Sequence, residues 1–247
     1  MEEVRALSMF SGCGALDLGL ERAGISVVAQ CEIEPHAIGV LGRHWPDTPN
    51  LGDVRTAPFH EVTAEMVAAG FPCQDISNAG NRAGIEGERS GLWSEVVRAI
   101  SLVQPQWVLL ENVAALLSRG LGRVLGDLAA LGFDAVWHCI PASHVGAPHN
   151  RDRIWITAAS HALGGERWAK PYCRTLGRMG REQQSVPWDR DWQSALCELR
   201  GMDDGSAYRV DRIDTLRNAV VPQIAETIGR AIIAANRAIS TDTAGRE

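Results

Sequence analysis

The sequence predicts an α/β fold with a doubly wound, mostly parallel β-sheet and one small irregular insert. Short apolar runs alternate with helical segments as far as residue 158, an order typical of such sheets. Polar or glycine-rich residues stand at or just after the predicted strand ends, at 11–14, Glu32, Asp53, Cys73 and Glu111. Because parallel strands end at the same edge of a sheet, we expect these residues to converge on one site. A length of 247 residues with 45% hydrophobic content suits one large domain with a substantial core.

The N-terminal half shows this alternation element by element. An apolar run at 4–9 predicts the first strand, and regularly spaced leucines predict a helix over 16–24. The same unit recurs as a strand at 25–30 and a helix at 35–44. A further apolar stretch at 64–69 predicts the strand that leads into a proline-containing turn.

The alternation continues beyond that turn. Residues 92–103 have the spacing of an amphipathic helix, and 107–110 form a run of the buried-strand type. A helix at 124–131 is followed by glycine, a typical C-cap. Apolar runs at 135–140 and 154–158 predict two more strands.

Residues 160–207 break the pattern. This segment is polar, shows little apolar periodicity and carries three of the eight tryptophans, Trp168, Trp188 and Trp192. We therefore interpret it as an insert or small subdomain. A long helix at 219–239 has one apolar face, and the tail at 240–247 is expected to fray.

The charge distribution is uneven. The net charge of −6 disfavours a nucleic-acid partner at first sight, but residues 165–181 contain a single acid, Glu166. The same stretch holds a basic cluster: Arg167, Lys170, Arg174, Arg178 and Arg181. Guanidinium groups suit bidentate contact with phosphate and guanine. A coding bias towards arginine explains the scarcity of lysine in the chain, but it does not explain the local cluster.

The six cysteines follow no pairing pattern, and the sequence has no CxxC or Cys/His cluster. This favours a reducing compartment and predicts neither a disulfide framework nor a metal site. No signal peptide or membrane span is visible, so we expect a cytoplasmic protein that does not contact membranes.

Two acidic residues follow a glycine-rich turn. The turn Phe10-Ser11-Gly12-Cys13-Gly14 lies between a predicted strand and helix, where glycines let a ligand approach the backbone. Glu32 lies about twenty residues further on, at the next strand end, where an acid typically accepts hydrogen bonds from ribose hydroxyls. Asp53 could take an adenine amino group. Each acid alone could be a solvated loop carboxylate, but their order favours a cofactor site.

The run Gly70-Phe71-Pro72-Cys73-Gln74 places a thiol on a proline-stiffened turn. Taken alone, it predicts a reactive thiol and a packed one about equally.

These blocks together resemble the DNA (cytosine-5)-methyltransferase family. The matching blocks occur in the family's order: Phe10-Ser11-Gly12-Cys13-Gly14, Glu32, Asp53-Val54, Gly70-Phe71-Pro72-Cys73-Gln74, Arg89-Ser90-Gly91-Leu92-Trp93, Glu111-Asn112-Val113, Arg151-Asp152-Arg153 and Asn218-Ala219-Val220-Val221-Pro222. The resemblance implies the S-adenosylmethionine-dependent methyltransferase fold. It further implies a catalytic and cofactor-binding domain at 1–156, a short target-recognition region at 157–208 and a C-terminal segment at 209–247 that returns to the catalytic domain.

The resemblance also implies a reaction and its residues. Cys73 would add to carbon 6 of a flipped-out cytosine in duplex DNA, so that carbon 5 can attack the methyl of S-adenosyl-L-methionine. Glu111 would hold or protonate ring nitrogen 3, and Arg151 and Arg153 would grip the base. The implied cofactor residues are Phe10, Ser11, Gly12, Cys13, Gly14, Ala15, Leu16, Glu32, Ile33, Asp53, Val54, Gly70, Pro72, Leu92, Asn218, Ala219 and Val220. The predicted DNA contacts are Gln74, Ser77, Arg89, Arg167, Lys170, Arg174, Arg178 and Arg181.

The chain departs from the family pattern in two places. The target-recognition region is short, as in compact phage or prophage enzymes, and Arg217 stands where glycine usually precedes the asparagine of the last motif. Arg217 could contact a phosphate, Asp214 or an anionic group, even a carboxylated variant of the cofactor. Alternatives to a DNA methyltransferase are an RNA cytosine methyltransferase of the same fold and a catalytically idle DNA-binding homologue. We expect a monomer, with or without a cognate restriction enzyme.

Overall fold

The computed structural model describes residues 3–72, 91–145, 151–182 and 220–244. Six strands form one sheet in the order β2-β1-β3-β4-β6-β5. Their bounds are Arg5–Met9 for β1, Ser26–Cys31 for β2, Met66–Ala69 for β3, Trp107–Val113 for β4, Phe133–Pro141 for β5 and Asp152–Ser160 for β6. The first four are parallel, and β6 runs antiparallel to its neighbours β4 and β5. The predicted α/β class with a mostly parallel sheet is confirmed.

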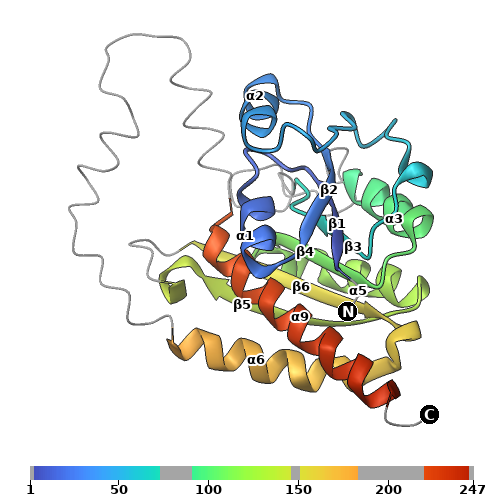
Figure 1. Ribbon diagram of the computed structural model, residues 1–247, viewed down its shortest axis with the longest axis vertical. Coiled ribbons are helices and arrows are strands. Elements are labelled where there is room, and N and C mark those ends of the chain that lie inside the picture. The colour runs from blue at the N-terminus through green and yellow to red at the C-terminus, as the bar shows by residue number, and fades with distance from the viewer. Residues whose placement is uncertain (1–2, 73–90, 146–150, 183–219, 245–247) are drawn as a thin grey trace, which may run out of the picture.

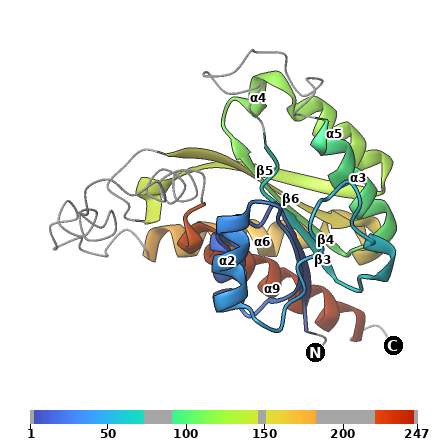
Figure 2. The same cartoon turned by 90° about the horizontal axis from the view of Figure 1, so that it is seen from above.

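Helices cover both faces of the sheet (Figures 1 and 2). One face carries α1, α6 and α9, and the other carries α3 and α5. The helix bounds are Ala15–Ala23 for α1, Pro35–His44 for α2, Leu92–Val103 for α3, Leu116–Arg119 for α4, Leu121–Ala130 for α5, Ala169–Glu182 for α6 and Pro222–Ala244 for α9. Short 3-10 turns lie at Phe59–Glu61, Ala142–Val145, His161–Leu163 and Gly165–Trp168.

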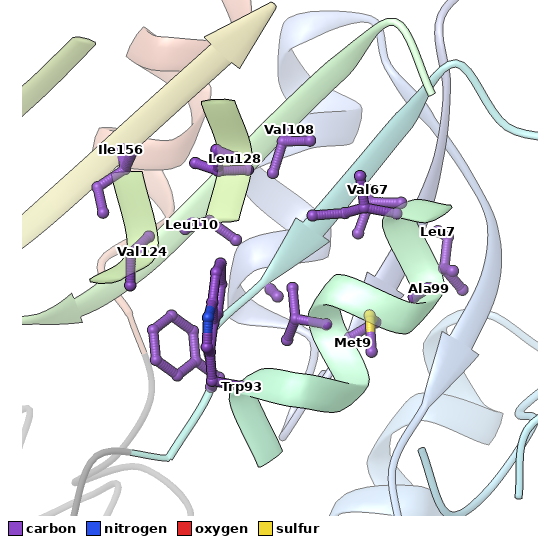
Figure 3. Packing of buried hydrophobic residues seen from close by; sticks show 14 of the residues in the cluster. Leu7, Met9, Val67, Trp93, Ala99, Val108, Leu110, Val124, Leu128 and Ile156 are labelled. Carbon is purple, nitrogen blue, oxygen red and sulfur yellow. The ribbon is translucent and has the colours of Figure 1, made fainter. Parts of the chain in front are cut away.

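Each strand divides its apolar side chains between the two faces. Along β4, Val108 and Leu110 pack towards α3 and α5, whereas Trp107 and Leu109 pack towards α1, α6 and α9. This division follows from the two-residue period of a strand, and it explains why the first part of β4, residues 107–110, is a continuous apolar run. Figure 3 shows the side chains on the face that α3 and α5 cover, where Leu110 lies beside Leu128 of α5.

Two glycines let α1 and α9 approach closely. A Cβ on Gly19 would lie 2.4 Å from the carbonyl oxygen of Pro222, and a Cβ on Gly229 would lie 2.7 Å from the Cβ of Ala23. This contact fixes the start of α9 beside the middle of α1.

The structure corrects three expectations. The tail at 240–247, expected to fray, is helical as far as Ala244, because α9 continues to that residue. The segment after β6 is not irregular throughout, because residues 169–182 form the helix α6. Its apolar residues Trp168, Tyr172 and Leu176 recur every four residues and pack into the core, a stripe that the intervening polar residues obscure. Strand β4 also continues past Leu110 to Val113, so Glu111 lies within it, because β6 pairs along its whole length.

Candidate active site

The turn after β1 has an unusual backbone. Phe10, Gly12 and Gly14 all have positive φ, at 57°, 55° and 79°. This conformation is easy for glycine but strained for a bulky side chain such as phenylalanine. Strained residues tend to cluster at ligand sites, where the surrounding structure holds them in place.

The Glu32 carboxylate ties this turn to the end of β2. One of its oxygens accepts from the Gly12 backbone N–H at 2.7 Å, and the other accepts from the Ile33 and Glu34 N–H groups at 2.8 Å each. A carboxylate offers about four lone-pair sites, so roughly one remains for a ligand hydroxyl. Glu32 is therefore held rigidly with acceptor capacity to spare.

A buried polar cluster supports the turn from below. The Asp17 carboxylate accepts from Ser8 Oγ at 2.5 Å and from Gln30 Nε2 at 2.7 Å. Ser11 Oγ in turn donates to Ser8 Oγ at 3.0 Å. Burial raises the pKa of Asp17 from 3.8 to about 6, although the two hydrogen bonds oppose the rise. The cluster connects a carboxyl group in the core to the turn after β1.

A cavity of about 690 Å³ opens at the carboxyl ends of the parallel strands. It brings together fourteen of the predicted cofactor residues, namely Phe10, Ser11, Gly12, Cys13, Ala15, Leu16, Glu32, Ile33, Asp53, Val54, Gly70, Pro72, Leu92 and Val220. Gly14 does not line it, and a Cβ there would lie 2.3 Å from the Trp45 ring, so its missing side chain serves packing. Sequence reasoning missed several lining residues, among them Cys31, Glu34, Arg55 and Asn112.

Asp53 lines the cavity and is paired with Arg55. Its two oxygens accept from the Arg55 side chain at 2.8 to 3.1 Å, and one also accepts from the Arg55 backbone N–H at 2.9 Å. These hydrogen bonds hold the pKa of Asp53 below its ordinary value. An adenine amino group at Asp53 would share the carboxylate with Arg55.

Glu111, on β4, faces the cavity as a buried acid beside a cation. One of its carboxylate oxygens lies 2.9 Å from Arg153 Nε, and only 10% of the side chain is exposed. The antiparallel pairing of β4 with β6 delivers Arg153 there, because Val113 stands opposite Arg153. Burial raises the pKa of Glu111 from 4.5 to about 6, while Arg153 and Arg151 oppose the rise. A carboxyl group tuned in this way can hold or release a proton near neutral pH.

Asn112 fixes the backbone that precedes the predicted nucleophile. Its side-chain amide donates to the Phe71 carbonyl at 3.1 Å, and its oxygen accepts from the Val113 N–H at 2.8 Å. The Phe71 ring packs on Trp93, with centroids 5.2 Å apart. The chain therefore enters the turn at Pro72 from a fixed position beside Glu111.

Two cysteines of the described residues line the cavity, and neither is activated. Burial raises the pKa of Cys31 to about 12, and it raises that of Cys13 as well. Both therefore stay protonated near neutral pH. Since the thiolate is the reactive form, neither is a candidate nucleophile.

Several predicted site residues lie outside the described residues: Cys73, Gln74, Ser77, Arg89, Asn218 and Ala219, together with Arg217. The basic cluster is placed on or beside α6, away from the cavity lining, with Arg167, Lys170, Arg174 and Arg178 exposed. Arg181 lies in the last turn of α6.

Two absences hold for the described parts of the chain. No helix there is long and apolar enough to cross a membrane. In those same parts, no group of three or more His, Cys, Asp or Glu residues is placed to hold a metal ion.

The fold and the cavity define an α/β protein with a cofactor-sized site at the ends of its parallel strands. The family model for C-5 cytosine-specific DNA methylases matches residues 4–186. The chain therefore belongs to the C-5 cytosine-specific DNA methylase family.

Named relatives agree with this assignment. The Type II methyltransferase M.NgoBV of Neisseria gonorrhoeae is 31% identical over 209 residues, which cover 76% of this chain and 49% of the relative. M.Eco47II of Escherichia coli, also a Type II methyltransferase, is 33% identical over 196 residues, which cover 75% of this chain and 47% of the relative. The chain spans about half the length of the curated relatives that it matches.

Solved structures share the fold. A protein described as a DNA modification methyltransferase encoded within an E. coli prophage superposes with a TM-score of 0.55 and 25% identity, covering 65% of this chain and 48% of that one. DNMT2 of Spodoptera frugiperda superposes with a TM-score of 0.52 and 13% identity, covering 95% of this chain and 98% of that one. This is a likeness in fold alone.

Proposed function

We propose that this protein transfers a methyl group from S-adenosyl-L-methionine to carbon 5 of a cytosine flipped out of duplex DNA. The observation that carries the proposal is the Glu111–Arg153 pair, which stands in the same cavity as the Glu32 turn. One part of the cavity thus offers the acid and cation that a cytosine ring requires. Another part offers a carboxylate suited to a ribose.

The cavity suits the cofactor in size and lining. Its volume of about 690 Å³ falls within the usual range for small-molecule sites. Glu32 keeps acceptor capacity for a ribose hydroxyl, and the side chain of Ile33, 60% exposed, offers an apolar surface to a base. When bound, S-adenosylmethionine supplies the methyl group as an electrophile.

Glu111 acts on ring nitrogen 3 of the cytosine. With a pKa of about 6, part of its population carries a proton near neutral pH and can donate it. Arg153 holds the carboxyl group in place, and Arg151, which also lines the cavity, adds positive charge for the base's carbonyl oxygen.

Cys73 is the proposed nucleophile. Its thiolate adds to carbon 6 while nitrogen 3 is stabilised by Glu111, and carbon 5 then becomes nucleophilic and takes the methyl group. Loss of the carbon 5 proton to a base, with water as the candidate, and expulsion of the Cys73 thiolate restore the ring. The raised pKa values of Cys13 and Cys31 support this choice among the thiols near the site.

The remaining assignments follow from the family and the basic cluster. We assign 1–156 to catalysis and cofactor binding, 157–208 to target recognition, and 209–247 to the segment that returns to the cofactor. Gln74, Ser77 and Arg89 are the proposed DNA contacts near the flipped base. We further propose a cytoplasmic monomer that acts alone or beside a cognate restriction enzyme, as the Type II class of its relatives suggests.

Transfer of labelled methyl groups from S-adenosylmethionine tests the proposal. The purified protein is given duplex DNA, single-stranded DNA or tRNA, and label is expected on duplex DNA. Label on tRNA alone would contradict the proposal and favour an RNA cytosine methyltransferase of the same fold. No label on any substrate would favour the catalytically idle homologue.

Cys73→Ala tests the nucleophile. Transfer should fall below detection, because no other group in the mechanism can add to carbon 6. Cofactor affinity, measured by calorimetry, should stay within a few-fold of wild type. Cys139→Ala, which removes an exposed thiol away from the cavity lining, serves as the matched control that keeps transfer. A large loss of cofactor binding in Cys73→Ala would make Cys73 a structural residue instead.

A further inference from the structure

We propose that the exposed face of α6 binds the phosphate backbone of the DNA that flanks the target cytosine, and that it does so without reading sequence. Lys170, Arg174 and Arg178, which we call the α6 basic row, recur every four residues and are all exposed. This inference rests on the proposed function, because it assigns α6 a contact with the same DNA substrate.

An aromatic anchor fixes the opposite face of α6. Trp168, at the entry to the helix, packs edge-on against Trp107 of β4 with centroids 5.5 Å apart. The Tyr172 hydroxyl bonds Thr157 Oγ1 of β6 at 2.8 Å, and Trp168 and Tyr172 are both almost fully buried. Helical residues two positions apart point about 200° apart, so burial of Tyr172 aims Arg174 at solvent.

The direction of α6 brings the row towards the active-site edge of the sheet. Trp168 packs at the start of β4, and Tyr172 is tied to Thr157, which stands opposite Leu109. Arg178 lies six residues beyond Tyr172, which is about 9 Å along the helix axis. A strand advances about 3.3 Å per residue, so the same distance corresponds to between two and three residues beyond Leu109 along β4. Arg178 therefore lies roughly level with Glu111 along the sheet.

Figure 1 supports this direction. Helices α6 and α9 lie side by side and run in opposite directions, so the end of α6 and the start of α9 share one side of the molecule. Val220, just ahead of α9, lines the cavity. DNA held at the cavity could thus reach the last turns of α6.

The row is built in a way that favours an external anion. In the described part of the chain, none of its three cations forms an ion pair, whereas Arg98 and Arg230 are paired with glutamates on their own helices. Like charges four residues apart destabilise a helix unless an anion lies between them.

The exposed surface beside the row carries small side chains. Cys173 and Gly177 occupy the same exposed face, and a Cβ on Gly177 would meet nothing within 4 Å. Packing therefore does not require this glycine, although glycine in a helix interior lowers stability. Small residues let a bulky polyanion approach the helix backbone.

These features suit phosphates better than bases. The row follows one ridge of a helix whose opposite face packs into the core, so it presents charge to solvent along the side of the helix and not at its end. Cations in such a line bind the charged backbone, which is the same for every sequence. Base reading is left to residues beyond α6.

A salt titration of DNA binding tests the inference. Fluorescence anisotropy measures the affinity for a labelled duplex several helical turns long, with wild type and with the triple variant K170Q/R174Q/R178Q. The variant should bind roughly tenfold or more weakly at low salt. Its slope of log affinity against log salt should fall by about one for each lost phosphate contact. Duplexes of unrelated sequence should lose affinity by the same factor.

The matched control removes three exposed arginines from α1, α2 and α9, as R22Q/R43Q/R237Q, and should keep the wild-type salt slope. A triple α6 variant with wild-type affinity and slope would overturn the inference, as would a loss confined to one DNA sequence. Circular dichroism of the variant should match wild type, since the anchor residues are untouched. Wild-type methyl transfer to the same DNA is measured in parallel, so that failure of the proposed function is seen separately.

Discussion

Replacing Asp17 with asparagine should stabilise this protein at neutral pH. The Asp17 side chain is fully buried at the start of α1, and its two oxygens accept from Ser8 and Gln30. Asparagine has the same shape, its oxygen can accept from Ser8, and its amide can donate to Gln30 once that side-chain amide rotates. The substitution therefore removes a buried charge while keeping the hydrogen bonds.

The pKa of Asp17 gives the size of the effect. Burial raises it from 3.8 to about 6, so the folded state holds its proton more tightly than the unfolded state does. Stability therefore falls as pH rises from 3.8 through 6, by about 3 kcal/mol in full. About half of that loss has occurred by pH 5, and the remainder of between 1 and 2 kcal/mol follows by pH 8. The asparagine variant lacks this loss.

Urea unfolding at pH 5 and pH 8 measures the difference. Asp17→Asn should gain on wild type by between 1 and 2 kcal/mol on going from pH 5 to pH 8. Asp47→Asn, which removes the same charge from an exposed site, should show no such change. A variant less stable than wild type at pH 8, or a difference that does not change with pH, would refute the reasoning.

Three further predictions concern the site and its support. Glu111→Gln should lower the methyl-transfer rate by at least about 100-fold, since glutamine cannot give a proton to the base, while urea unfolding at pH 8 should show a folded protein. Gly19→Ala should destabilise the protein by about 1–3 kcal/mol in thermal unfolding, because its Cβ would lie 2.4 Å from the Pro222 carbonyl oxygen. Gly39→Ala is the control, because a Cβ there meets nothing and helix propensity improves by up to about 1 kcal/mol. Asn112→Ala should destabilise by about 1–3 kcal/mol and slow transfer more than it weakens cofactor binding, and equal effects on both would contradict a positioning role.

Local signals explain why much of the fold was predictable. The strands β1, β2 and β3 and the helices α1 and α2 lie within a few residues of their expected bounds. Each is a short apolar run or an apolar helical stripe bounded by glycine or proline, so the signal lies within the segment itself. Most of the predicted cofactor residues line one cavity, because parallel strands end at one edge.

Helix α6 shows where that reasoning fails. Its core-facing stripe consists of Trp168, just ahead of the helix, Tyr172 and the partly buried Leu176. Basic residues stand between them, so the composition is typical of a polar loop. The helix becomes visible only once its partners are known. Trp107 on β4 and Thr157 on β6 accept the two aromatic side chains, and neither is close to them in sequence.

Neighbouring residues encode the alternation of strands and helices, the acidic and glycine-rich strand ends and the family motifs around Glu111, so the amino-acid sequence alone predicts them. Tertiary structure decided which of these groups meet. The antiparallel pairing of β4 with β6 sets Arg153 against Glu111, and burial at that place raises the pKa of the glutamate to about 6. Strand pairing and desolvation depend on residues far apart in the chain, which no local pattern records.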